Sequence, residues 1–237
     1  MQFYFRLGSL GSMSLFQRAV FFKSALEPWD LPAESRCEVA FAGRSNAGKS
    51  SALNTLVGQA RLAFASKTPG RTQPINYYSL GDDRFLVDLP GYGYAKIAKH
   101  ARKPWGRLLG DYLYTLSALA GLVLVMDSRH ALTELDWSLL EWFHATGKPM
   151  HAILTKADKL SRAEANTVLD DVRRELFSRS PLWTAQLFSS LKRTGIAEAR
   201  AIIGGWLGET AVENAHHHKP RQLQGFRNKK APGKRGE

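Results

Sequence analysis

Two observations predict an α/β fold for this chain of 237 residues. Short apolar runs alternate with helical patterns between about residues 37 and 209, and one pair of apolar runs has no helix between its members. Strands that alternate with helices form a largely parallel sheet covered on both faces, whereas two strands joined by a short turn form a hairpin. We therefore expect a three-layer sandwich around a six-stranded, mostly parallel sheet with one antiparallel strand.

The expected strands are short runs rich in apolar residues, at 38–42, 75–80, 84–88, 121–127, 151–155 and 184–188. The expected helices carry apolar residues at helical spacing, at 49–57, roughly 105–119, 132–146, 162–177 and 196–207. The turn GDD at 81–83 joins the two strands of the hairpin. In such a sheet, ligands bind outside the carboxyl ends of the strands, so the loops at those ends are the first place to look for chemistry.

The chain is strongly basic, with 33 Lys and Arg against 21 Asp and Glu and a net charge of +12. This balance favours a polyanionic partner or an acidic membrane surface. The longest apolar run, 118–126, is too short to cross a bilayer, which takes about 20 residues. The single cysteine, Cys37, excludes an internal disulfide, suits a reducing cytoplasm and, since it opens an apolar strand, is expected to be a buried, inert thiol. We expect an unprocessed cytoplasmic protein without a membrane span, starting at Met1 or Met13.

The segment GRSNAGKSS at 43–51 matches the phosphate-binding pattern G-x-x-x-x-G-K-[ST]. Gly43 and Gly48 let backbone N–H groups turn inward around phosphate oxygens, Lys49 places a positive charge on the β and γ phosphates, and the Ser50 hydroxyl is a ligand for Mg²⁺. The motif follows an apolar strand and opens a helix, as this mechanism requires. A P-loop nucleotide site is therefore the firmest functional prediction.

The segment TKAD, comprising Thr155, Lys156, Ala157 and Asp158, indicates which base is bound. A carboxylate at Asp158 accepts hydrogen bonds from N1–H and the 2-amino group of guanine, and adenine offers neither there, so the site rejects adenine. The alkyl stem of Lys156 would lie along the base. In isolation the same residues start the next helix, with Asp158 as a cap or a solvated residue.

Two further segments are candidates for sensing the γ-phosphate. Asp88 ends an apolar strand and is placed to hold Mg²⁺ through water, and the N–H of Gly91, in DLPGYGYAK at 88–96, is placed to bond the γ-phosphate. Upstream, SKTPGRTQP at 66–74 is rich in turn formers, and Thr72 is the candidate hydroxyl that closes on Mg²⁺. Taken alone, Thr72 is an ordinary loop threonine.

The segments GRSNAGKSSALN, TPGRTQPINYY, DLPGYGYAK, TKADKL and FSSLKRTG occur in this order, and with them the chain resembles the EngB (YihA/YsxC) GTPases of the TrmE–Era–EngA–EngB–septin class. The resemblance covers about residues 17–210. It implies a Ras-like P-loop fold, Mg²⁺-dependent binding of GTP and GDP, slow hydrolysis of GTP, a role in maturation of the large ribosomal subunit, and a link to cell division and septation. It divides the chain into an N-terminal extension at 1–16, a GTPase domain at 17–210 and a basic tail at 211–237 that is expected to be disordered.

The resemblance also implies a set of nucleotide contacts. The catalytic residues would be Lys49, Thr72 and Gly91. The residues that hold Mg²⁺ would be Ser50, Thr72 and Asp88. The remaining contacts would come from the P-loop, the two sensing segments, TKAD and a last loop that braces guanine: Gly43, Arg44, Ser45, Asn46, Ala47, Gly48, Gly70, Arg71, Gln73, Pro74, Leu89, Pro90, Thr155, Lys156, Ala157, Asp158, Phe188, Ser189 and Ser190.

Tyr92 stands where many GTP-hydrolysing proteins carry a glutamine that positions water. A phenol cannot both donate to and accept from a water as an amide does, so the missing stabilisation must come from an arginine or a cation. By resemblance to potassium-activated GTPases, Asn46 is a candidate for helping to bind K⁺ beside the phosphates; alternatively, Asn46 only stabilises its loop. Arg71 is a candidate for acting in cis.

The stretch 92–110 contains no acid and interleaves Lys96, Lys99, Arg102, Lys103 and Arg107 with aromatic residues. Such a patch pairs with RNA phosphates and stacks on bases, although a solvated face fits the charge equally well. From residue 214 onward, seven Lys and Arg against one acid contribute +6 of the net charge. Ribosomal RNA of the large subunit is the favoured partner of a monomer; the alternatives are a P-loop kinase or ATPase, and an RNA-binding module without a GTP switch.

Overall fold

The computed structural model describes residues 14–33, 35–64, 74–92, 112 and 117–208. Within them lies a seven-stranded sheet in the order β1-β3-β4-β2-β5-β6-β7. The strands are β1 (Val20–Ala25), β2 (Cys37–Gly43), β3 (Ile75–Gly81), β4 (Arg84–Asp88), β5 (Leu119–Asp127), β6 (Met150–Thr155) and β7 (Trp183–Leu187). Each of the six predicted strands is present, with bounds that agree to within two residues.

The sheet is parallel except around β3, which pairs in the antiparallel sense with both β1 and β4. The hairpin predicted at 81–83 is present, and Asp82 and Asp83 both have positive φ, as the two central residues of a type I′ turn require. The sheet therefore contains one antiparallel strand, as predicted.

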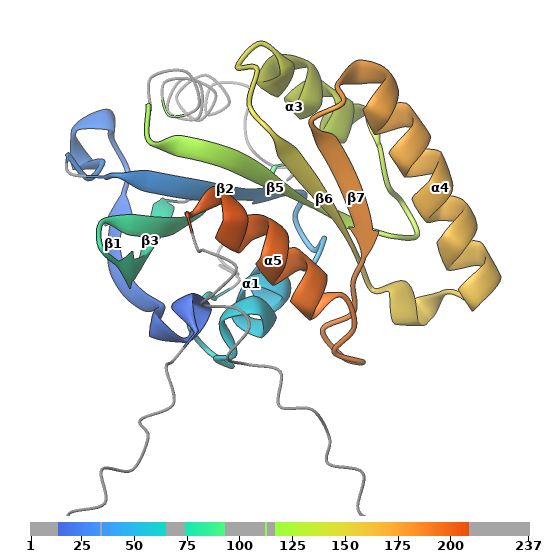
Figure 1. The fold of residues 1–237 in the computed structure, drawn as a ribbon, viewed down its shortest axis with the longest axis horizontal. Coiled ribbons are helices and arrows are strands. Elements are labelled where there is room, and N and C mark those ends of the chain that lie inside the picture. Colours follow the sequence, from blue (N-terminus) through green and yellow to red (C-terminus); the bar gives the residue numbers. More distant parts are fainter. Residues whose placement is uncertain (1–13, 34, 65–73, 93–111, 113–116, 209–237) are drawn as a thin grey trace, which may run out of the picture.

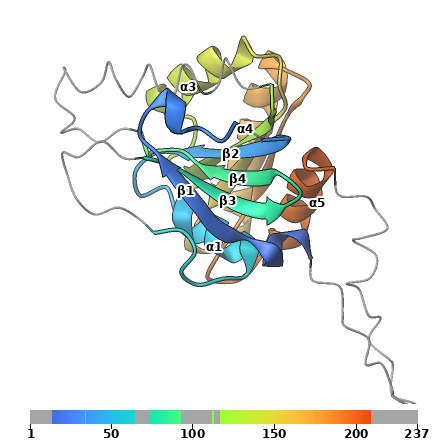
Figure 2. The ribbon, with the colours of Figure 1, turned by 90° about the vertical axis from the view of Figure 1, so that its left-hand side faces the viewer.

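The number of strands was predicted wrongly, because the described part of the chain alone forms seven strands and not six. The additional strand, β1, lies at the edge of the sheet beside β3 (Figure 2). Its first three residues, Val20, Phe21 and Phe22, are all exposed, so the strand lacks the alternation of buried and exposed side chains by which an edge strand is recognised in a sequence.

Helices cover both faces of the sheet (Figure 1). On one face lie α1 (Lys49–Val57) and α5 (Ile196–Trp206), and on the other lie α3 (Glu134–His144) and α4 (Arg162–Arg179). Short 3₁₀ helices span Leu15–Arg18, Pro28–Asp30 and Ala157–Lys159. The three-layer arrangement predicted from the sequence is confirmed.

The helix predicted at about 105–119 falls mostly outside the described residues. Tyr112 is helical, but Leu119, its expected last residue, belongs to β5. Leu119 is 1% exposed and pairs with Glu38 of β2, so sheet pairing and burial take precedence over the helical spacing of the apolar residues. That boundary of the prediction was wrong.

Two apolar clusters form the core, one on each face of the sheet. Phe143 of α3 and Leu176 of α4 belong to one, and Leu53 of α1 and Ile203 of α5 belong to the other. The second cluster also includes Leu15 and Phe16, which are 6% and 1% exposed although the sequence places them in the N-terminal extension.

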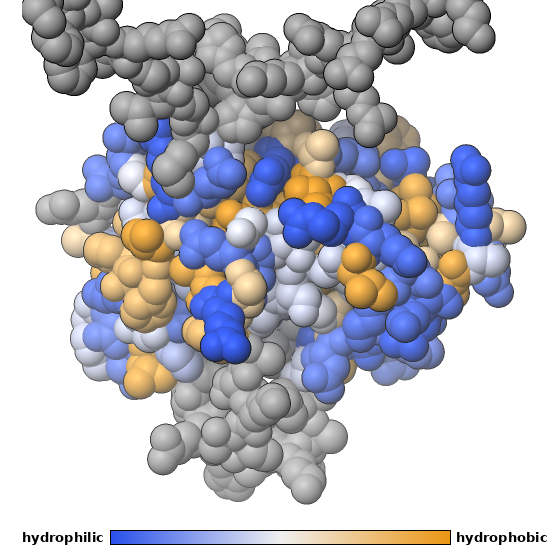
Figure 3. Space-filling view, turned by 90° about the horizontal axis from the view of Figure 1, so that it is seen from below, coloured by the Kyte–Doolittle hydropathy of each residue, from blue (hydrophilic) through white to orange (hydrophobic). Residues whose placement is uncertain are grey.

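The surface on the side of α1 and α5 is largely hydrophilic, with small separate apolar patches (Figure 3). Isolated apolar side chains are usual on protein surfaces. Among the described residues, no helix is both long enough and apolar enough to span a membrane.

Candidate nucleotide-binding site

The P-loop connects the carboxyl end of β2 to the start of α1, and the backbone of this turn needs its glycines. A Cβ on Gly43 would lie 2.5 Å from the Val125 carbonyl oxygen, so no larger residue fits without moving β5. Gly48 has a φ of +94°, which favours glycine, and Asn46 has a φ of +66°, which asparagine tolerates better than most residues. The turn therefore has the fixed shape that a cradle of backbone N–H groups requires.

Lys49 and Asp88 meet beneath this turn. The Lys49 ammonium donates a hydrogen bond to Asp88 Oδ1, and their side chains are 11% and 5% exposed. Ser50 is the second residue of α1. A hydroxyl and a carboxylate suit Mg²⁺, which takes few protein ligands and completes its shell with water and phosphate oxygens. Among the described residues there is no cluster of three or more His, Cys, Asp or Glu that could hold a metal without a nucleotide.

The segment after β4 is joined to the P-loop through its backbone. Leu89 N donates to Phe41 O at 2.9 Å, and Tyr92 N donates to Gly43 O at 3.3 Å. Ser45 N in turn donates to Tyr92 O at 2.9 Å. A Cβ on Gly91 would lie 3.3 Å from Ser45 Oγ, a tight approach that glycine avoids. The two segments predicted to surround the terminal phosphate are therefore in direct contact.

The side chain of Tyr92 is buried, with the residue 7% exposed, and its hydroxyl donates to Asp136 Oδ1 of α3 at 2.7 Å. Burial, followed by the charge of Asp136, raises the pKa of this phenol well above its usual range, so the hydroxyl remains a donor. The phenol therefore contributes to the packing against α3 and is not a group that positions water. That Tyr92 does not position water was predicted from the sequence, whereas its hydrogen bond to Asp136 was not.

The TKAD segment reaches the P-loop from β6. Thr155 Oγ1 lies 2.5 Å from Ala47 O and 3.0 Å from Met126 O, and Lys156 Nζ donates to Asn46 O at 2.8 Å. Lys156 has a φ of +57°, which directs this side chain back over the P-loop. The P-loop and TKAD are thus in contact in the structure, as predicted.

Asp158 lies next to the loop after β7. Ser189 Oγ donates to Asp158 Oδ1 at 2.5 Å, and Ala157 N donates to Phe188 O at 3.2 Å. Phe188 N in turn donates to Leu154 O at 2.8 Å, which continues the sheet pairing into the loop. Ser190 is the next residue of that loop. These contacts fix the Asp158 carboxylate while leaving its other oxygen free of any hydrogen bond among the described residues.

One position that the sequence analysis overlooked, Asp127, also shapes this site. Asp127, at the carboxyl end of β5, lies 2.9 Å from Lys156 Nζ and accepts two hydrogen bonds from the Arg129 guanidinium. The bonds from Arg129, and then those from Lys156, hold the pKa of the Asp127 carboxyl well below its usual range. Its signal was an acid at the tip of an apolar strand, the same signal that identified Asp88.

A buried polar chain braces the loop after β7. His151 Nε2 lies 2.9 Å from Gln186 Oε1, and Gln186 Nε2 donates to Gly195 O at 2.6 Å. The Gln186 amide therefore accepts from His151, whose other ring nitrogen lies 2.8 Å from Thr184 Oγ1. No sequence pattern distinguishes these residues from ordinary strand positions.

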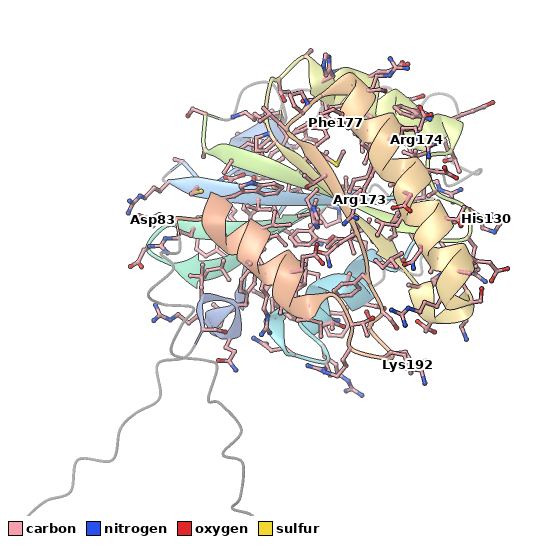
Figure 4. All side chains as sticks on the ribbon, turned by 45° about the vertical axis from the view of Figure 1, so that its right-hand side comes forward. Asp83, His130, Arg173, Arg174, Phe177 and Lys192 are labelled. Carbon is pink, nitrogen blue, oxygen red and sulfur yellow. The ribbon has the colours of Figure 1, made fainter. Side chains whose placement is uncertain are left out.

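Beside Asp158 there is a cavity of about 500 Å³ between α4 and α5. Its lining includes Ser189, Arg173, Lys192 and Glu198. Arg173 extends from α4 toward β7, where its Nε donates to Ala185 O at 2.9 Å, and Lys192 lies on the loop before α5 (Figure 4).

Some predicted positions lie outside the described residues. They are Gly70, Arg71, Thr72 and Gln73 of the upstream loop, residues 93–110 of the basic stretch, and the tail at 211–237. Pro74 is described and immediately precedes β3.

Comparison with known proteins decides the family. Residues 38–156 match the sequence model of a family described as a 50S ribosome-binding GTPase. The chain is 60% identical over 195 residues to a probable GTP-binding protein EngB from Methylobacillus flagellatus, covering 82% of this chain and 94% of the relative. This chain belongs to the EngB family of GTPases. A relative from Thiobacillus denitrificans, also named a probable GTP-binding protein EngB, is 56% identical over 198 residues, covering 84% of this chain and 95% of that one.

Solved structures agree on the fold of this EngB-family chain. A crystal structure of a probable GTP-binding protein EngB superposes with a TM-score of 0.59 at 19% identity, covering 73% of this chain and all of the other. Aquifex aeolicus Era, in a variant bound to GDP and aluminium fluoride, superposes with a TM-score of 0.55 at 18% identity, covering 72% and 56%. The solved structures confirm the predicted Ras-like fold. The family model and the sequence relatives confirm the predicted family and GTPase activity.

Proposed function

We propose that this EngB-family GTPase is a Mg²⁺-dependent, nucleotide-controlled assembly factor for the large ribosomal subunit, acting as a cytoplasmic monomer and needed for normal cell division and septation. The observation that carries the proposal is the convergence of Gly43–Lys49, Gly91, Lys156 and Asp158 at the carboxyl ends of neighbouring strands. The family description as a 50S ribosome-binding GTPase supports the choice of partner.

In this proposal, the backbone of residues 43–48 and the Lys49 ammonium hold the β and γ phosphates. Ser50 and Asp88, with Thr72, provide the oxygen ligands for Mg²⁺, which neutralises phosphate charge when bound. Gly91 N–H contacts the γ-phosphate, so that loss of this phosphate releases the segment that follows. Lys49 has to exchange Asp88 for phosphate when nucleotide binds, and the low exposure of both side chains makes that exchange an intrinsic part of binding.

Base selection is assigned to Asp158, which accepts from guanine N1–H and its 2-amino group. The hydrogen bond from Ser189 supports this role, because it restricts the carboxylate to one orientation. Phe188–Ser190 bound the base through their backbone groups. The remaining contacts predicted for residues 44–47, 70–74, 89 and 90 belong to the same proposal.

Hydrolysis by the isolated protein is expected to be slow. The buried phenol of Tyr92 supports this expectation, since it offers no group to orient the attacking water. The added stabilisation is assigned to K⁺ held with the help of Asn46, which lies in the P-loop with a φ of +66°.

The proposed ribosomal contact rests on charge and on its position in the chain. The net charge of +12 favours ribosomal RNA, and the basic stretch 92–110 directly follows Gly91, which is proposed to sense the γ-phosphate. We propose that nucleotide state controls this stretch, that the basic tail adds salt-dependent affinity, and that the GTPase domain spans about 17–210.

The direct test is co-sedimentation of the full chain with purified large ribosomal subunits in GTP, in GDP and without nucleotide. The proposal predicts binding that depends on the nucleotide and weakens with salt. The matched control is Lys49→Ala, which removes the charge on the phosphates. Equal binding by wild type under all three conditions, and by the variant, would favour an RNA-binding module without a GTP switch.

A further inference from the structure

Tyr92 is held at two ends. Its backbone pairs with the P-loop, where its N–H donates to Gly43 O at 3.3 Å and its carbonyl accepts from Ser45 N at 2.9 Å. Its hydroxyl reaches α3 and donates to Asp136 Oδ1 at 2.7 Å. Because Gly91 precedes it directly, the orientation of the Gly91 peptide depends on both attachments.

Asp136 is a fully buried carboxylate in the first turn of α3, with an exposure of 0%. Its Oδ2 accepts from Thr133 N at 2.8 Å and from Thr133 Oγ1 at 2.7 Å, which caps the helix. The hydrogen bonds and a nearby cation offset the cost of burying the Asp136 carboxylate, and they hold it in a fixed position.

That cation comes from the P-loop. Arg44 Nε lies 3.9 Å from Asp136 Oδ2, and one of its terminal nitrogens donates to His130 O at 3.2 Å. Arg44 also pairs with Tyr92 as an isolated parallel bridge. The carboxylate of Asp136 thus connects three parts of the protein: the P-loop, the turn at Gly91 and the start of α3.

We propose that Asp136 is a positioning residue for GTP hydrolysis, which acts through the Tyr92 hydroxyl to hold the Gly91 peptide against the P-loop. The inference rests on the proposed contact between Gly91 N–H and the γ-phosphate. A donor contributes most to the transition state when it is already oriented toward the developing charge. GDP lacks the γ-phosphate, so its binding does not depend on that orientation. Tyr92, which stands where many GTPases have a glutamine, thus anchors the Gly91 peptide to α3.

The test compares two tyrosine variants of the full chain. Tyr92→Phe removes the hydrogen bond to Asp136. Tyr112→Phe is the matched control, because Tyr112 is also buried and donates to Glu38 Oε2 at the same distance of 2.7 Å, at the opposite end of β2 from the P-loop. Each variant therefore removes one core hydroxyl from one buried carboxylate.

For Tyr92→Phe we expect the single-turnover rate of GTP hydrolysis to fall by about three- to tenfold. This is less than the full contribution of a hydrogen bond to a charged acceptor, because Tyr92 acts on the phosphate only through the Gly91 peptide. The GDP dissociation constant should stay within about twofold of wild type, on the ground that no GDP contact changes. Tyr112→Phe should lower the melting temperature without changing the rate. Asp136→Asn, which keeps an acceptor for the phenol, should retain more activity than Asp136→Ala.

The inference is overturned if Tyr92→Phe hydrolyses GTP at the wild-type rate, or if its rate and GDP affinity fall together. If Tyr92→Phe does not fold, the comparison is made between Asp136→Asn and Asp136→Ala, where a lower single-turnover rate for Asp136→Ala at an equal GDP dissociation constant is expected and equal rates overturn the inference. If wild type binds GTP and all variants hydrolyse it at the wild-type rate, the role of Asp136 is refuted and the proposed function is not. A wild-type chain that does not bind GTP refutes the proposed function as well.

Discussion

The side chain of Lys156 bridges two motifs that lie 110 residues apart in the sequence. Its ammonium donates to Asn46 O in the P-loop at 2.8 Å and lies 2.9 Å from Asp127 Oδ2 at the end of β5. The segment proposed to recognise the base is thereby fixed to the segment proposed to hold the phosphates.

Lys156→Ala should weaken GDP binding by about ten- to hundredfold, because hydrogen bonds from a charged group contribute about 1.5–3 kcal/mol. Isothermal titration of GDP measures the change. The control is Lys159→Ala, which removes an exposed lysine three residues later. An unchanged dissociation constant for Lys156→Ala would show that the bridge between the two motifs has no part in binding.

Asp158→Asn should reverse the choice of base. An amide at this position still has an oxygen that accepts from N1–H, but its N–H faces the guanine 2-amino group, which is also a donor. Xanthine offers a carbonyl oxygen in place of that amino group and can accept from the amide. GDP affinity should therefore fall by orders of magnitude, and xanthosine diphosphate should bind better than GDP. Asp171→Asn on the exposed side of α4 is the control, since Asp171 pairs only with Arg174 among the described residues. Retained GDP preference in Asp158→Asn would place guanine recognition elsewhere.

Potassium should accelerate hydrolysis. In matched KCl and NaCl buffers we expect faster turnover with K⁺, and Asn46→Ala should remove most of the difference, because a lost stabilising group at the developing charge costs on the order of 10² in rate. The backbone carbonyl that accepts from Lys156 is unaffected by this substitution. Equal wild-type rates in the two salts refute the potassium hypothesis and favour an arginine.

Stability should depend on pH through His151. Burial, the largest effect, lowers the pKa of this imidazole from 6.5 to about 4. The unfolded chain therefore binds a proton before the folded chain does, so His151 reduces the free energy of unfolding as the pH falls from about 6.5 to about 4, by up to about 3 kcal/mol. Urea unfolding of wild type and His151→Gln over this range measures the effect.

The comparison with His151→Gln is needed because other groups titrate nearby. Burial raises the pKa of Glu38, so its contribution to stability falls as the pH rises and opposes that of His151. Glu38 is present in both proteins, so its contribution cancels in the difference. A pH dependence that is the same in wild type and variant would mean that His151 is neutral, or charged, in both the folded and unfolded chains.

The P-loop and TKAD could be predicted from the sequence because each is a short contiguous motif at the end of an apolar strand. The carboxyl ends of parallel strands meet at one edge of a sheet, so the contact between Thr155 and the Ala47 carbonyl follows from the strand pattern. Gly43 could be predicted as part of the P-loop motif, but the close approach of β5 that leaves no room for a Cβ there is a tertiary contact that the motif does not show.

Features that depend on tertiary contacts could not be predicted. The strand β1 lies at an edge and exposes Phe21 and Phe22, so its pattern does not indicate a half-buried strand. The direction of the Tyr92 side chain depends on Asp136, 44 residues later, which in the sequence reads only as a residue in the first turn of a helix. Asp127, in contrast, could have been predicted, because it is an acid at the end of an apolar strand, as Asp88 is.

The most direct test of the account is isothermal titration of the purified full chain with GDP, GTP and ATP in buffer with excess Mg²⁺. The account predicts binding of both guanine nucleotides with one site per chain, and no heat of association with ATP. Binding of ATP with comparable affinity, or no binding of either guanine nucleotide to folded protein, would contradict it.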